Sequence, residues 1–134
     1  MLDTRLRLVA AGVALVLSAS LTVASSATAE PAAPRAAEPR TITIKGVEPR
    51  PNVFIAKGRV FPAYENKPAI MQRKLKGAER WTTWKTFETN GSSRYRQRIA
   101  ALQRVGVVCY RVKVQGNAEF KNSFSRRVCI RTFR

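Results

Sequence analysis

The sequence predicts an all-β domain of seven antiparallel strands, arranged as a sandwich or a barrel. Three observations lead to this prediction. From Thr41 onward, short runs of alternating polar and apolar residues follow one another at intervals of about 8 to 15 residues. Proline, glycine and asparagine residues separate these runs. Two cysteines, Cys109 and Cys129, fall in the last two runs at positions that would face each other across a hairpin.

Each predicted strand is an alternating run that ends where turn residues begin. Segment 98–104 is the one helical competitor, and we reject it because it is short and has no capping residue. No helical pattern separates the strands, which favours a sandwich or barrel over parallel α/β units. The predicted strands cover residues 41–47, 53–60, 69–75, 81–89, 94–101, 105–114 and 126–133.

The last two strands provide a register test. If Cys109 faces Cys129, then Val108 pairs with Ile130, Tyr110 with Val128, and Val114 with Phe124, so one face is apolar. The other face then carries Cys109, Arg111, Lys113, Arg127, Cys129 and Arg131, with Arg126 opposite Val112 as the exception. A disulfide closing this loop of about 20 residues is expected to contribute about 3 kcal/mol.

The first 29 residues have the pattern of a secretory signal peptide. Arg5 and Arg7 supply the positive start, residues 8–17 form an apolar stretch, and Ala27-Thr28-Ala29 is a small-residue cleavage pattern. A membrane anchor is the alternative, but serines and threonines interrupt the apolar run before it reaches spanning length. We therefore expect a secreted, extracellular protein in which an even number of cysteines favours a disulfide.

The mature chain is expected to be strongly basic and to consist of one domain. The signal contains two of the 25 basic residues and one of the 8 acidic ones, which leaves a net charge of +16 on 105 residues. Residues 30–40 contain three prolines and are predicted to be a disordered or extended linker before the domain at 41–134. Charge of this size attracts polyanions, although solubility through repulsion is the simpler explanation.

The quoted strands also resemble a known family. The similarity lies in Tyr110-Arg111-Val112-Lys113-Val114 with Ser123-Phe124-Ser125, in the segments 58–62 and 71–74, and in the Trp81 and Trp84 pair. In these residues the chain is similar to immunoglobulin-like or fibronectin type III-like modules of secreted actinobacterial proteins. This resemblance implies a seven-stranded sandwich and no particular activity. The tryptophan usual in the second strand is absent, and Tyr110 adjoins Cys109, which implies a disulfide within one sheet.

No catalytic machinery is recognisable, so we expect a protein that is not an enzyme and binds no cofactor. Histidine is absent, and the few glutamates form no pair placed for glycosidase chemistry. A metal site would need more soft ligands than two cysteines provide. Glu88 beside Trp84 could form a sugar platform, but a core tryptophan and a solvated carboxylate explain the pair better.

The aromatic and basic residues offer the remaining candidates. Trp81 and Trp84 are three residues apart, so one should face the core and the other could form an exposed platform. Arginines alternate along the fifth strand, and Arg111 is expected opposite Arg127, an unfavourable contact that a bound anion would relieve. A solvated face is the alternative. The candidate binding residues are Arg94, Arg96, Arg98, Arg111, Lys113, Arg127 and Arg131.

The function we predict is electrostatic binding to anionic extracellular material, such as cell-wall polymer or nucleic acid, by a monomeric accessory domain. Two alternatives remain open. The hairpin loop 115–123 could present an inhibitor or effector surface to a protein partner. The domain could also be a structural spacer that uses its charge only for solubility.

Overall fold

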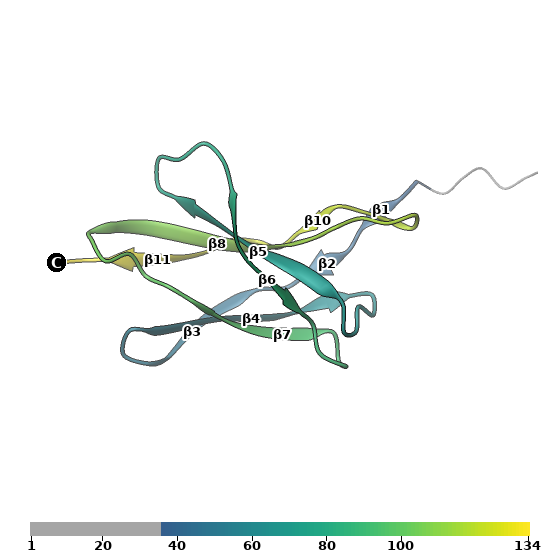
Figure 1. The fold of residues 1–134 in the computed structure, drawn as a ribbon, viewed down its shortest axis with the longest axis horizontal. Coiled ribbons are helices and arrows are strands. Elements are labelled where there is room, and N and C mark those ends of the chain that lie inside the picture. Colours follow the sequence, from purple (N-terminus) through teal and green to yellow (C-terminus); the bar gives the residue numbers. More distant parts are fainter. Residues whose placement is uncertain (1–35) are drawn as a thin grey trace, which may run out of the picture. The chain divides into compact units, whose positions relative to one another are not determined.

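The computed structural model describes residues 36–134, so the predicted signal peptide and residues 30–35 of the predicted linker lie outside it. The described residues contain strands and no helix, which confirms the all-β prediction. Accordingly, this part of the chain has no helix long and apolar enough to cross a membrane. The strands form two main layers (Figure 1), each of which has one face turned toward a shared core.

One layer is a five-stranded antiparallel sheet. Its central strands are β8 (Gly106–Val114) and β5 (Pro68–Leu75), and β6 (Thr82–Glu88) pairs with the far edge of β5. On the other edge of β8, β10 (Ser123–Phe124) and β11 (Val128–Thr132) follow one another. The predicted sixth and seventh strands are therefore neighbours, as the cysteine spacing indicated.

The second layer is a four-stranded antiparallel sheet built around β4 (Val53–Phe61). One edge of β4 pairs with β2 (Thr41–Ile42) and β3 (Lys45–Arg50), in the same register on either side of a short interruption. The other edge pairs with β7 (Arg94–Ile99). In Figure 1, β3, β4 and β7 lie together below β8 and β11.

Alternating residues of both layers meet in one apolar core. The rings of Phe87 on β6 and Tyr95 on β7 lie 5.3 Å apart and connect the two sheets. The Tyr110 hydroxyl donates a hydrogen bond of 2.7 Å to the Ala100 carbonyl beyond the end of β7. The buried apolar side chains are Ile42, Ala56, Val60, Tyr64, Ala69, Met71, Phe87, Tyr95, Ile99, Val108, Tyr110, Val112, Val114 and Ile130.

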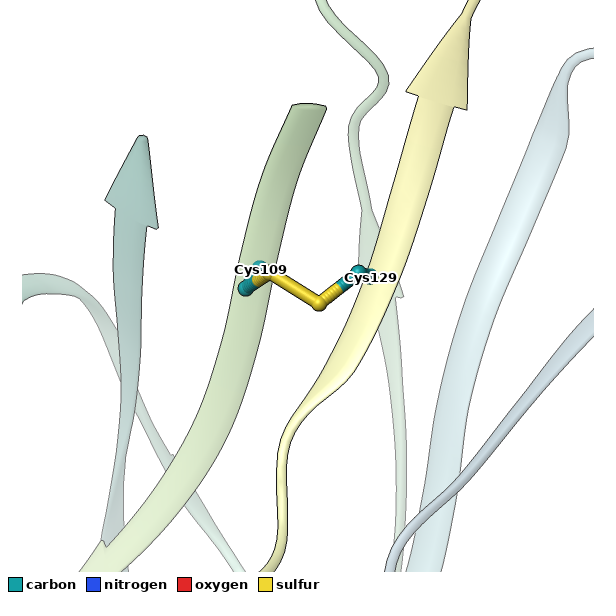
Figure 2. Close-up of a disulfide and its surroundings, with 2 residues drawn as sticks. All are labelled: Cys109 and Cys129. Atoms are coloured by element: carbon teal, nitrogen blue, oxygen red, sulfur yellow. A yellow bond between two sulfur atoms is a disulfide. The ribbon is translucent and has the colours of Figure 1, made fainter. Parts of the chain in front are cut away.

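The disulfide forms as predicted and lies within one sheet. Cys109 on β8 is bonded to Cys129 on β11, directly across the strand pair (Figure 2). The neighbouring pairs Val108–Ile130 and Tyr110–Val128 are also confirmed.

Beyond the disulfide, the predicted register of the last two strands is wrong by one residue. Val114 pairs with Ser123, and Phe124 pairs with Lys113. A continuous register would have turned Arg126 toward the core opposite Val112. The shift at 126–127 instead buries Ser125, whose hydroxyl accepts a hydrogen bond of 2.8 Å from the Val112 amide. Because a one-residue shift reverses the two faces, Phe124 points outward and is 45% exposed.

The end of the predicted linker is packed against the domain. Glu38–Pro39 forms β1, which pairs in parallel with β9 (Phe120–Lys121), and Arg40 is buried. The Arg40 guanidinium lies 4.0 Å from the centre of the Phe120 ring and donates to the Pro62 carbonyl at 3.0 Å. For residues 38–40 the expectation of an unpacked linker is therefore corrected, because this arginine finds carbonyl and aromatic partners that replace water.

The interruption between β2 and β3 depends on a glycine. The main chain at Thr43 passes so close to Gly58 that a Cβ atom at position 58 would lie 1.9 Å from the Thr43 carbonyl oxygen. The Tyr95 hydroxyl donates a hydrogen bond of 2.6 Å to that same carbonyl. Burial raises the pKa of Tyr95, so the phenol keeps its proton and remains a donor.

This close approach predicts that Gly58→Ala destabilises the domain, because the clash is with backbone that cannot rotate away. Overpacking of this kind typically costs about 1–3 kcal/mol. The matched control is Gly91→Ala, since a Cβ at Gly91 has no atom within 4 Å. Urea unfolding of both variants measures the difference. Equal midpoints for the two variants would show that the contact at Gly58 does not constrain the fold.

Candidate functional site

Basic side chains of three neighbouring strands lie directly across from one another on the outer face of the four-stranded sheet. Lys57 of β4 pairs with Lys45 of β3 on one side and with Arg96 of β7 on the other. The next row pairs Arg59 with Arg94. We call this set the basic face; its members, all exposed, are Lys45, Lys57, Arg59, Arg94, Arg96 and Arg98.

The core determines which way these side chains point. Tyr95 and Ile99 on β7, and Ala56 and Val60 on β4, are buried, so the residues between them must face away from the core. The predicted candidates Arg94, Arg96 and Arg98 are thus brought together on this face. Their partners Lys45, Lys57 and Arg59 were not predicted, because only strand pairing reveals them. The sequence signal that could have indicated two of them is the alternation of Lys57 and Arg59 with core residues in the second predicted strand.

The rows are electrostatically unfavourable as they stand. Neighbouring strands lie about 4.8 Å apart, and alternate residues along a strand are about 6.8 Å apart. Like charges directly opposite on a strand pair are destabilising, on the order of 0.2–1 kcal/mol for each contact. The basic face is therefore a grid of positive charge that an extended anion would stabilise.

A shallow depression of about 860 Å³ crosses this face. Five of the six basic residues line it, and Arg98 is the exception. Glu88 is the one carboxylate among the lining residues. The Arg59 guanidinium packs 4.6 Å from the centre of the Phe61 ring at the edge of the depression. The depression is open and shallow, so it suits contact along a polymer better than enclosure of a small molecule.

Arg111 lies on the opposite sheet, where its contacts are structural. Its guanidinium lies 4.4 Å from the centre of the Trp81 ring and 4.3 Å from that of Phe124. Its Nε donates a hydrogen bond of 2.9 Å to the Gln72 side chain. Partial burial lowers the pKa of this guanidinium, which nevertheless stays charged. Arg111 is thus held between two aromatic rings.

The predicted pair of Arg111 and Arg127 is not among the strand pairs. Residues 126 and 127 lie outside the strands, where the register shifts, so Arg127 has no partner directly across on β8. Lys113 shares the outer face with Arg111 and pairs with Phe124, and Arg131 pairs with Val107. The seven predicted binding residues are therefore divided between the outer faces of two sheets.

The two tryptophans point to opposite faces, as their spacing predicted. The Trp84 ring packs edge-on against Tyr110 at 6.0 Å, next to the core. The Arg73 guanidinium forms a cation–π contact with this ring, 4.3 Å from its centre. Trp81 lies on the outer face beside Arg111. Neither ring forms an open aromatic platform, because an arginine covers part of each.

The loop 115–123 is held by its own hydrogen bonds. The side chain of Asn117 accepts hydrogen bonds from the amides of Glu119 and Phe120, at 2.9 and 2.8 Å. The loop also contains β9, which pairs with β1. Within residues 36–134, no group of three or more His, Cys, Asp or Glu side chains is placed to hold a metal ion.

Comparison with protein-family models gives no match for this chain, and comparison with curated proteins gives none either. Its function must therefore be inferred from the geometry of its own residues.

The packing of Arg111 predicts that Arg111→Ala lowers the free energy of unfolding of the domain. The substitution removes two cation–π contacts and one hydrogen bond, so we expect a loss of about 1–2 kcal/mol in the free energy of unfolding. Lys113→Ala, on the same strand and face, is the control and should stay within about 0.5 kcal/mol of the wild type. Urea unfolding compares the two. If Arg111→Ala matched Lys113→Ala in stability, the contacts of Arg111 with the two rings would not stabilise the fold.

Proposed function

We propose that this protein is a secreted, non-catalytic accessory domain that binds anionic extracellular polymers through its basic face. The observation that carries the proposal is the row of Lys45, Lys57 and Arg96 across three paired strands. A fold gains no stability from aligning like charges in this way. An anionic polymer lying across the strands would supply the missing counter-charges.

Binding by such a face is electrostatic and depends on salt. Each cation that contacts a phosphate releases a counterion, so the logarithm of affinity falls linearly with the logarithm of salt concentration. Arginine forms paired hydrogen bonds to phosphate or carboxylate, whereas lysine acts as a point charge. The mixture of both on one flat face favours recognition of charge density over recognition of one shaped group.

The same proposal includes the fold family and export. The strand order supports a fibronectin type III-like sandwich when β2 with β3, and β10 with β11, each count as one interrupted strand. Seven strand positions then form sheets of three and four strands. The Cys109–Cys129 disulfide supports export, because such bonds persist in oxidising compartments. The N-terminal sequence pattern supports cleavage after Ala29.

The alternatives predict different behaviour. An inhibitor or effector would lose its activity when residues of the loop 115–123 are replaced by alanine, with the basic face unchanged. A spacer would keep its localisation when the basic face is neutralised. No contact in the described residues favours either alternative over polymer binding.

The basic face can be tested by neutralising its centre. We expect the triple variant Lys57→Gln, Arg94→Gln and Arg96→Gln to bind a labelled single-stranded oligonucleotide more weakly than the wild type. Its salt slope should be shallower by about 2, because about 0.7 is lost for each phosphate contact removed. Fluorescence anisotropy over a range of salt concentrations measures both quantities.

The matched control removes the same charge elsewhere, with Lys67→Gln, Arg80→Gln and Lys121→Gln at three exposed positions. It should keep a slope close to that of the wild type. Equal weakening of both variants would indicate diffuse attraction with no defined face. Salt-independent binding would contradict the proposal altogether.

Export predicts a defined N-terminus. When the full chain is produced in a bacterium with a functional secretion pathway, the protein recovered from the medium should begin at Glu30 and contain no free thiol. Intact-mass measurement before and after thiol alkylation tests both points. Recovery of uncleaved chain from the cell alone would argue against the predicted signal.

A further inference from the structure

A second basic concavity surrounds the disulfide on the other sheet. It is a depression of about 430 Å³ between the turn that follows β5 and the strand β11. Its walls include four cations, one tryptophan and the disulfide, and no carboxylate is among its lining residues. We call it the disulfide pocket; the residues used below are Lys74, Lys76, Arg127, Arg131 and Trp81.

The disulfide pocket and the basic face lie on opposite sides of the core. Lys74 pairs with Cys109, which pairs with Cys129, so these three positions share one face of the five-stranded sheet. The residues beside the two cysteines, Val108, Tyr110 and Ile130, are buried. The pocket therefore opens away from the core, on the outer side of the layer that contains β8 and β11.

The pocket has the chemistry of an anion site. Lys76, Arg127 and Arg131 are exposed, which leaves their charges free to meet a ligand. Trp81, part of which Arg111 covers, adds an apolar wall to the pocket. A phosphate or carboxylate group carried on a polymer backbone can pair with the exposed cations.

We propose that the disulfide pocket is a second site for anionic polymer, so that one copy of the domain links two polymer chains. This inference rests on the proposed function of the basic face. Packed sheets are separated by about 10 Å, and the side chains on both outer faces add to that distance. A chain that lies across β3, β4 and β7 therefore leaves the disulfide pocket free for another chain.

Linking has a characteristic dependence on concentration. When polymer exceeds protein, one copy can hold a separate chain at each of its two sites and so link them. When protein exceeds polymer, each chain is saturated by separate copies and the links disappear. If some polymer chains carry a fluorescent donor and others an acceptor, energy transfer between them should thus rise and then fall as protein is added.

The test uses oligonucleotides labelled with a donor and oligonucleotides labelled with an acceptor, mixed in equal amounts. A parallel arm uses labelled oligogalacturonate, to separate phosphate from carboxylate as the preferred group. The pocket variant carries Lys76→Gln, Arg127→Gln and Arg131→Gln. The other two proteins are the basic-face variant and the charge-matched control described above, each with its fold checked by urea unfolding.

We expect the wild type and the control to give energy transfer with a maximum at intermediate protein concentration. The pocket and basic-face variants should each still bind one chain, with the transfer signal lost because the second contact is lost. Wild-type transfer in the pocket variant would overturn the inference. If the wild type bound oligonucleotide but gave no energy transfer, the linking of two chains would be overturned and the proposed function would stand. If the wild type bound no oligonucleotide, the proposed function would be overturned as well.

A second readout reports occupancy of the pocket itself. In a Trp84→Phe background, Trp81 is the one remaining tryptophan of the chain. Oligonucleotide binding should then change the tryptophan emission, and the change should disappear when the three pocket cations are replaced. Emission that changes equally in the pocket variant would show that the ligand does not contact this site.

Discussion

Lys45, Lys57 and Arg96 occupy directly paired positions on three neighbouring strands, and their alternation with core residues fixes them there. Turning any of them inward would bury a charge among Ala56, Tyr95 and Ile99, at a cost far above that of surface repulsion. The apolar core thus fixes these three positions on the outer face, where nothing in the fold requires them to be cationic. Natural proteins tolerate such local destabilisation chiefly where function requires it. The proposed polymer binding follows from this constraint.

Several other arginines of the described residues pack on aromatic rings, in keeping with the small number of carboxylates in the chain. Arg40 lies between the rings of Tyr64 and Phe120, and Arg111 lies between those of Trp81 and Phe124. These arginines hold elements together: Arg40 anchors the N-terminal segment, and Arg111 on β8 contacts Gln72 of β5, Phe124 of β10 and Trp81, the residue before β6. The basic face differs because, apart from Arg59 beside Phe61, its cations have no such ring contact in the described residues. Arg40 and Arg111 are thus occupied by contacts within the fold, whereas most cations of the basic face are not.

Sequence alternation and turn residues were sufficient to predict the strands, because period-2 burial is a local property of the chain. The cysteine pair was sufficient to place β8 beside β11. The register shift at 126–127 and the packing of Arg40 were not predictable, since each depends on distant partners: Val112 in one case, Phe120 and Pro62 in the other. For the same reason, only half of the basic face was identified. Arg94, Arg96 and Arg98 form a local pattern, whereas their alignment with Lys45, Lys57 and Arg59 exists only in the folded sheet.

The row of Lys45, Lys57 and Arg96 should destabilise the unliganded fold. The most direct measurement is the free energy of unfolding of Lys57→Gln, the middle residue of the row, relative to the wild type at low and high salt. We expect the variant to be the more stable protein at low salt, and its advantage to shrink as salt screens the charges of the row. A variant that is equally or less stable at low salt would contradict the claim.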